Sequence, residues 1–315
     1  MAAVYCALTC VLMLIMMPRL VDPVGMAVMR VEWLAMTLCL AFAQRFTARF
    51  SASPDRGRVG VGLHSSIFTF IRVSAQMAWL AVWYPDTYEF NRLFVNLDHV
   101  FASCEQALFG CQPALLFSPQ FSSPWVSEPL CLGYVSYYPM IGAVAAYYFL
   151  KRYERFAYSA FVILASFFLF YVVLIFLPVA GPQFYYEAVG TDQIAAGYFP
   201  ALGHYFLSHQ ESLPIPGQGL FHDLVQQAHN AGERPTAAFP SSHVGVSVVL
   251  LWLAWEACSL RLFLPLLLLT ALMFFATFYI QAHYAIDAIA GLFAGTALYW
   301  LLRWVYRLQV FGARR

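Results

Sequence analysis

Two histidines and an aspartate are the residues of this chain whose types and spacing point most directly to chemistry. His243 lies in FPSSHVGVS, residues 239–247, and His283 and Asp287 lie four apart in YIQAHYAIDAIAG. Residues four apart share one face of a helix, so the carboxylate can accept a hydrogen bond from one ring nitrogen. That bond would fix the tautomer and make the other nitrogen a better nucleophile. The H-x-x-x-D pattern alone is more typical of a structural hydrogen bond, so its meaning depends on where the elements place it.

The peptide FPSSH has the residue types of a helix start. Either Ser241 or Ser242 can cap the apolar helix that follows, and the free N–H groups of its first turn then point toward the preceding loop. A helix N-terminus is a ready site for a phosphate group. These parts suit phosphoryl transfer, because they would supply a nucleophilic imidazole, a second imidazole that protonates the leaving oxygen, and donors for the phosphate oxygens.

The composition is that of an integral membrane protein. Of the residues, 62% are hydrophobic and only 10% are charged, with a mean hydropathy of +0.67. The net charge of +1 and the single lysine, Lys151, argue against nucleic-acid binding. Seven cysteines without a C-x-x-C pair argue against a structural zinc or iron–sulfur site. Cys104 and Cys111 could form a disulfide or remain two thiols.

Apolar segments bounded by charge, proline or polar clusters predict an all-α polytopic bundle of about eight transmembrane helices. The N-terminal segment lacks a basic start and a clear cleavage site, so we interpret it as a retained helix. The eight predicted segments are 2–17, 26–43, 66–83, 129–149, 157–178, 243–257, 262–280 and 284–302.

The links between these helices predict three regions. Residues 1–65 would hold two helices and a basic cytoplasmic loop, and 66–302 would form the catalytic core with outer loops 84–128 and 179–242. Residues 303–315 would form a basic cytoplasmic tail. Within 84–128, apolar residues recur every three or four positions, which predicts an amphipathic helix lying on the outer membrane surface.

Loop charges predict the orientation, because Lys and Arg accumulate on the cytoplasmic side. The links 44–65 and 151–155 are basic, whereas each of the two long loops has one arginine against five acidic residues. Both chain ends would then be cytoplasmic, and His243 and His283 would meet at the outer face. We expect an inner (plasma) membrane of a bacterium, with the site on its periplasmic side. The aromatic run YVSYYP, residues 134–139, is more typical of an interfacial belt than of a substrate site.

The motif PSSH, followed some forty residues later by H-Y-x-x-D-x-x-A-G, resembles the lipid phosphate phosphatase superfamily, or type-2 phosphatidic acid phosphatases. The resemblance covers roughly residues 130–302 and implies a six-helix membrane core. The pieces LPVAGPQFYY at 177–186 and AAFPSSHVGVS at 237–247 look most like the branch that includes inositol phosphorylceramide synthases.

The resemblance implies a role for each matching residue. His283 would attack phosphorus and form a phosphohistidine, Asp287 would orient it, and His243 would protonate the leaving group. This chemistry requires no metal ion, and we expect no cofactor. The groups implied to hold the phosphate oxygens are Ser241, Ser242 and the amides near Val244 and Gly245.

The chain departs from the family pattern where basic residues are expected. Its only lysine, Lys151, lies on the predicted cytoplasmic side; Gln183 and Thr277 occupy positions where the family brings a cation. We predict that Arg234, nine residues before the PSSH histidine, reaches the phosphate; otherwise it is a loop arginine paired with Glu233. Because few basic residues are predicted near the phosphate, a phosphodiester or monoanionic substrate is favoured over a dianionic monoester.

The predicted function is therefore cleavage of a lipid phosphate ester, with a phospholipid or an isoprenoid or sphingolipid phosphate as substrate. The acceptor would be water, as in a phosphatase, or a lipid hydroxyl such as that of ceramide, as in a transferase. The alternative is a transporter or channel with His283 and Asp287 as a proton relay. An intramembrane serine protease is a weaker option, because Ser247 lacks the surrounding motif. The sequence leaves the oligomeric state open.

Overall fold

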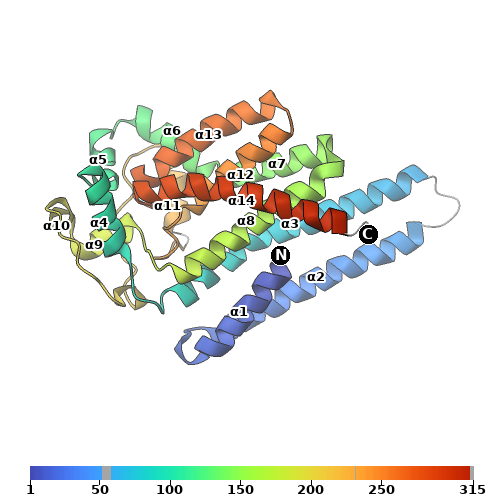
Figure 1. Ribbon diagram of the computed structural model, residues 1–315, viewed down its shortest axis with the longest axis horizontal. Coiled ribbons are helices and arrows are strands. Elements are labelled where there is room, and N and C mark those ends of the chain that lie inside the picture. The colour runs from blue at the N-terminus through green and yellow to red at the C-terminus, as the bar shows by residue number, and fades with distance from the viewer. Residues whose placement is uncertain (52–57, 231, 313–315) are drawn as a thin grey trace. The chain divides into compact units, whose positions relative to one another are not determined.

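The computed structural model of the chain is built from helices (Figure 1). The all-α prediction is confirmed, since the described part of the chain contains no strand. The predicted basic loop and tail are each described only in part. The described residues are 1–51, 58–230 and 232–312.

The chain divides into two compact units, Ala2–Glu89 and Phe90–Arg315. The first contains α1 (Ala2–Met16), the 3-10 helix η1 (Met17–Arg19), α2 (Pro23–Ser51) and nearly all of α3 (Arg58–Asn91). A buried ion pair joins α2 to α3, with 2.6 Å between Arg30 Nη2 and Asp86 Oδ2. The three N-terminal segments predicted from apolarity therefore form helices, whereas the predicted functional boundaries at residues 65 and 302 stay predictions.

The second unit holds the predicted catalytic residues and most of the helices. Its elements are α4 (Asp98–Phe109), α5 (Pro113–Gln120), α6 (Pro124–Val135), α7 (Tyr137–Lys151), η2 (Tyr153–Arg155), α8 (Phe156–Phe176), α9 (Pro182–Val189), α10 (Thr191–Ala195), η3 (Tyr205–Leu207), α11 (Leu220–Asn230), α12 (Ser242–Glu256), α13 (Leu260–Tyr279) and α14 (Ala285–Gly312).

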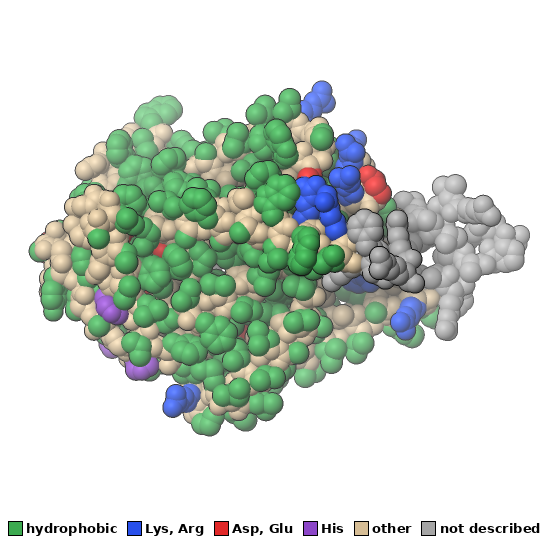
Figure 2. Space-filling model, viewed as in Figure 1, with side chains coloured by type: hydrophobic (Ala, Val, Ile, Leu, Met, Phe, Trp, Pro, Cys, Tyr) green, Lys and Arg blue, Asp and Glu red, His purple; other side chains and the backbone are tan. Residues whose placement is uncertain are grey.

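The helices identify an integral membrane protein. Among the described residues, six helices are long and apolar enough to cross a membrane, or seven if α6 and α7, bent by 49°, form one span. Hydrophobic side chains also cover most of the face drawn in Figure 2. The predicted count of eight is not confirmed. The remaining candidate, α12, has 15 residues and is about 22 Å long, shorter than a hydrocarbon core of about 30 Å.

Glycines bring α12 and α14 into close contact, and Figure 1 shows the two helices side by side. A Cβ atom on Gly295 would lie 2.2 Å from the carbonyl oxygen of Gly245, and one on Gly291 would lie 2.6 Å from that of Ser241. Small residues at these positions allow two backbones to approach in the way that is common between membrane helices. This contact holds the start of α12, which carries His243, against the start of α14, which carries Asp287.

The segment 84–128 is not the single amphipathic helix that its apolar spacing predicts. The structure ends α3 at Asn91 and starts α4 at Asp98. Long-range backbone bonds hold the break, since Leu97 N–H donates to Pro178 O at 2.9 Å. Two acidic residues that we counted among the charges of an outer loop, Asp98 and Glu105, are fully buried. Tertiary contacts therefore override the local periodicity here.

Candidate active site

The N-terminus of α12 is fixed by Ser241. Its Oγ accepts a hydrogen bond from Val244 N–H at 3.4 Å and its carbonyl accepts one from Gly245 N–H at 3.0 Å, so Ser241 is the N-cap. Its own N–H donates to the carbonyl of Asp287 at 3.0 Å. The cap thus ties the PSSH peptide directly to the first turn of α14.

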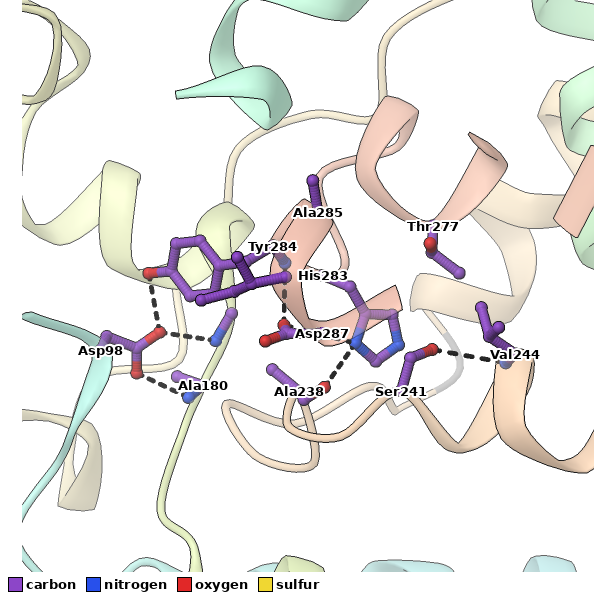
Figure 3. A network of polar contacts seen from close by, with 12 residues as sticks. Asp98, Ala180, Ala238, Ser241, Val244, Thr277, His283, Tyr284, Ala285 and Asp287 are labelled. Carbon is purple, nitrogen blue, oxygen red and sulfur yellow. Dashed lines mark hydrogen bonds and ion pairs between the residues drawn. The ribbon is translucent and has the colours of Figure 1, made fainter. Parts of the chain in front are cut away.

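His283 lies between α13 and α14, with its side chain buried (Figure 3). Its Nδ1 is 2.6 Å from the carbonyl oxygen of Ala238. A carbonyl oxygen only accepts hydrogen bonds, so Nδ1 carries a proton, and in the neutral ring Nε2 is the nitrogen with the free lone pair. The main chain is held as well, because His283 N–H donates to Thr277 O at 3.1 Å. His283 therefore has the tautomer of a nucleophile.

Asp287 is fully buried and lies beside His283, but it is not the acceptor that the sequence predicts. Its Oδ2 is 3.7 Å from His283 Nδ1, beyond hydrogen-bond distance, and instead accepts Tyr284 N–H at 2.8 Å. The reason is that α14 begins at Ala285, so His283 precedes the helix and helical i, i+4 geometry does not apply. At this distance the carboxylate still stabilises positive charge on the ring.

His243 faces His283 from α12, with 5.9 Å between the ring centroids. Tyr134 and Tyr137 also contact the His243 ring, at centroid distances of 4.8 and 4.5 Å. Tyr134 lies in α6 and Tyr137 in α7, on either side of the 49° bend between these helices. We interpreted this aromatic run as an interfacial belt, and its position around a bend gave no sequence signal for this contact.

Glu105 is a buried residue of the site that the sequence reasoning missed. From α4 its Oε1 accepts the N–H groups of Ala285, at 2.6 Å, and Ile286, at 3.3 Å, which are the first residues of α14. Burial and the nearby charge of Asp287 raise the pKa of Glu105 from 4.5 to about 8. Oε2 of Glu105 and Oδ1 of Asp287 are both buried, and neither has a hydrogen-bond partner in the described part of the chain.

Asp98 connects α4 to two other segments of the site and was also missed. It accepts hydrogen bonds from Ala180 N–H at 2.6 Å, from Gly181 N–H at 2.8 Å, and from the Tyr284 hydroxyl at 3.0 Å (Figure 3). Burial raises the pKa of Asp98, while these donors act in the opposite direction. An acidic residue inside an apolar stretch is the only signal that could have marked Asp98 or Glu105 as buried site residues.

Gly181 and Gln183 occupy the turn that we aligned with the first family motif. Gly181 has a φ of 99°, and a Cβ there would lie 2.6 Å from the carbonyl oxygen of Ala282, so only glycine fits against the residue before His283. Gln183 is buried, and its N–H donates to Gln281 O at 2.8 Å. The structure thus packs the predicted motif against the His283 segment.

The remaining predicted phosphate ligands differ in how close they lie to the two histidines and in how exposed they are. Ser242 is buried in the first turn of α12 beside His243, whereas the amides of Val244 and Gly245 donate to Ser241. Arg234 is exposed and donates to Gln210 Oε1. The contacts of the two histidine rings within the described residues include no lysine or arginine. A role for Arg234 at the phosphate therefore stays a prediction.

The acidic, histidine and cysteine side chains also bear on metal binding and on a disulfide. Within the described ranges, no group of three or more His, Cys, Asp and Glu side chains could hold a metal ion. Cys104 and Cys111 are both free thiols in the structure, which is the second of the two alternatives that the sequence left open.

Fold and site together define a membrane-embedded helical protein with two facing histidines and a buried aspartate at one end of its bundle. Comparison with protein families matches residues 99–301 to the PAP2 superfamily. The match covers well over half of the chain, so the chain belongs to this superfamily, as the sequence motifs predicted, and is a membrane enzyme of the phosphatase type. None of the curated proteins and none of the solved structures matches it.

Proposed function

We propose that the protein cleaves a phosphate ester of a membrane lipid through a covalent bond between phosphorus and His283 Nε2. The observation that carries this proposal is the bond from His283 Nδ1 to the carbonyl of Ala238, which makes Nε2 the nitrogen with the lone pair in the neutral ring. The buried carboxylate of Asp287, 3.7 Å from Nδ1, would stabilise the positive ring formed in the attack.

The proposed reaction has two steps that reuse the same groups. In the first, His283 Nε2 bonds to phosphorus, the bond from phosphorus to the leaving oxygen breaks, and His243 gives that oxygen a proton. In the second, an acceptor hydroxyl gives its proton to His243 and attacks phosphorus, and the N–P bond breaks. The contact of the His243 ring with His283, 5.9 Å between centroids, supports its role as the proton carrier.

The test is the capture of phosphorus label on the protein from a phospholipid labelled in its phosphate, followed by turnover in detergent. His283→Ala should abolish both labelling and turnover. The matched control is His209→Ala, because His209 is exposed in a loop of the same unit and stacks on Tyr205. Full turnover by His283→Ala would refute the nucleophile assignment. His243→Ala should be least harmful for aryl phosphates, whose leaving oxygen needs no proton; equal loss for all substrates would contradict the acid role.

We propose further that the substrate is a phosphodiester lipid and that the acceptor is a lipid hydroxyl, as in the inositol phosphorylceramide synthase branch. Support comes from the contacts of the two rings, which include no lysine or arginine among the described residues, because a dianionic monoester would need cations there. Assays with phosphatidylinositol, with and without ceramide, separate the options. Product that forms only with water, whatever the ceramide concentration, would contradict transfer. Equal activity on a soluble monoester would contradict the diester preference.

The family membership supports this enzyme over the alternative proton relay, and we propose the outer, periplasmic orientation for the site. Two exposed cysteines offer a direct test. Cys104 lies on α4, next to Glu105, which accepts a hydrogen bond from the start of α14. Cys258 follows the C-terminal end of α12, the end away from His243. In intact cells, a membrane-impermeant maleimide should label a variant that retains only Cys104, and not one that retains only Cys258. The reverse pattern would place the site on the cytoplasmic side.

A further inference from the structure

A hollow lies far from the histidines, at the other end of α12 and α14. It is a cavity of about 230 Å³ lined by Arg155, Arg303, Arg307 and Glu256, together with Tyr158 and Tyr306. The helix α12 starts beside His243 and ends at Glu256, so the two sites are separated by the whole length of that helix. A ligand in this cavity is therefore not the substrate held at the histidines.

The charges around the cavity are unbalanced. Glu256 is paired with Arg303, with 3.1 Å between Oε1 and Nη1. Arg155 and Arg307 are exposed, and within the described residues neither guanidinium group makes a hydrogen bond or an ion pair. Glu154 also borders the cavity, which leaves three arginines against two carboxylates. Two guanidinium groups thus face a hollow without an anionic partner of the protein.

The position of the cavity is that of a membrane surface. Arg155 and Tyr158 lie at the start of the candidate span Tyr153–Phe176, and Arg303 and Arg307 lie at the end of the candidate span Ala285–Leu308. The same end of α14 carries Trp300 and Trp304, which are exposed by 49% and 59%, and the guanidinium of Arg303 lies 5.1 Å from the centre of the Trp300 ring. Exposed tryptophans at the ends of spanning helices mark the headgroup level of the bilayer.

We propose that this cavity binds the phosphate of an anionic phospholipid from the leaflet opposite the catalytic site. Guanidinium groups bind phosphate oxygens through paired hydrogen bonds, and the two tyrosine hydroxyls add neutral donors. Basic hollows between spanning helices are a known form of headgroup site. The volume admits a phosphate with a small alcohol, and the lipid chains would extend along the apolar surface of α14 beside Trp304.

The test is a titration of the purified full-length protein with a short-chain phosphatidylglycerol and, separately, with the phosphatidylcholine of the same chain length, followed by native mass spectrometry. We expect the anionic lipid to bind more tightly. The double variant Arg155→Gln with Arg307→Gln should bind it roughly thirtyfold more weakly, which corresponds to about 1 kcal/mol for each arginine. Both arginines are exposed, so the variant should keep the melting temperature of the wild type without lipid.

The matched control is Arg261→Gln, because Arg261 is an exposed arginine at the same end of the bundle and does not line the cavity. Unchanged lipid binding by this variant would support a specific site formed by the residues that line the cavity. Equal weakening by Arg261→Gln and by the double variant would overturn the proposal, since binding would then follow overall charge. Equal binding of both lipids would also overturn it, as would binding of inorganic phosphate, at the same arginines, without binding of the anionic lipid.

Discussion

Replacing Glu105 by glutamine should make the stability of the protein less dependent on pH. The side chain is fully buried, and its Oε1 accepts two N–H groups at the start of α14. Glutamine has nearly the same shape and keeps one accepting oxygen, so the cap of α14 survives. What the substitution removes is the titration of a buried carboxyl group beside Asp287.

The size of the effect follows from the raised pKa of Glu105, about 8 in place of 4.5. At neutral pH the folded protein holds the acid protonated, whereas the unfolded chain ionises it, so rising pH favours unfolding. The stability that the wild type gains from its protonated Glu105 is fully present below about pH 4.5 and is lost as the pH rises through 8. Between these two pKa values the loss is about 1.4 kcal/mol for each pH unit. From pH 5 to 7 the wild type should lose about 2.5 kcal/mol relative to Glu105→Gln.

The assay is the melting temperature in detergent between pH 5 and 9. The melting temperature of Glu105→Gln minus that of the wild type should increase by roughly 5 °C from pH 5 to 7 and level off above pH 8. The matched control is Glu128→Gln, because Glu128 accepts the N–H groups of Phe221 and His222 near the start of α11 but is only partly buried.

Two outcomes would refute the reasoning. A melting-temperature difference that stays constant across the pH range would show that Glu105 is ionised in the folded protein like an ordinary carboxylate. The same slope in Glu128→Gln would show that the pH dependence belongs to helix capping in general and not to the buried carboxyl pair at Asp287.

Three further substitutions test the packing and the buried charges. Gly295→Ala should lower both the melting temperature and turnover, because the added Cβ would lie 2.2 Å from a carbonyl of α12; Gly142→Ala, with open space around it, should change neither. Asp98→Asn should destabilise the protein by about 1–3 kcal/mol for each donor left unpaired, measured by denaturant titration. Arg30→Met should cost about 3–5 kcal/mol in the same titration, because it leaves Asp86 buried without its cation; addition of Asp86→Leu should restore most of that loss.

The sequence was sufficient for features that depend on local composition. Long apolar runs predicted the helices, and charge counting predicted that His243 and His283 share one end of the bundle. The structure agrees, because α12 starts and α13 ends at that same end. The residue types of FPSSH also predicted a helix cap at Ser241 or Ser242, and Ser241 is the residue that provides it.

What the sequence could not predict depends on contacts between distant segments. Local periodicity continues through residues 92–97, but bonds to the loop before α9 break the helix there and turn Asp98 inward. The spacing of His283 and Asp287 suggested a direct hydrogen bond, which fails because His283 lies outside the helix and its Nδ1–H donates to the carbonyl of Ala238 instead. The acceptor in that bond is a main-chain carbonyl, and because every residue has one, the sequence cannot predict which carbonyl accepts the bond.

The long reach of the α4 carboxylates has a consequence for the order in which the protein is assembled. Asp98 bonds to Tyr284, and Glu105 to Ala285, partners that lie 186 and 180 positions later in the chain. At about 5–20 residues per second, the ribosome needs roughly 10–40 seconds to supply them. During that interval Asp98 and Glu105 lack the hydrogen-bond donors of Tyr284 and Ala285 that they need when buried in an apolar core. The catalytic end of the bundle must therefore close last, when the C-terminal helix arrives to receive them.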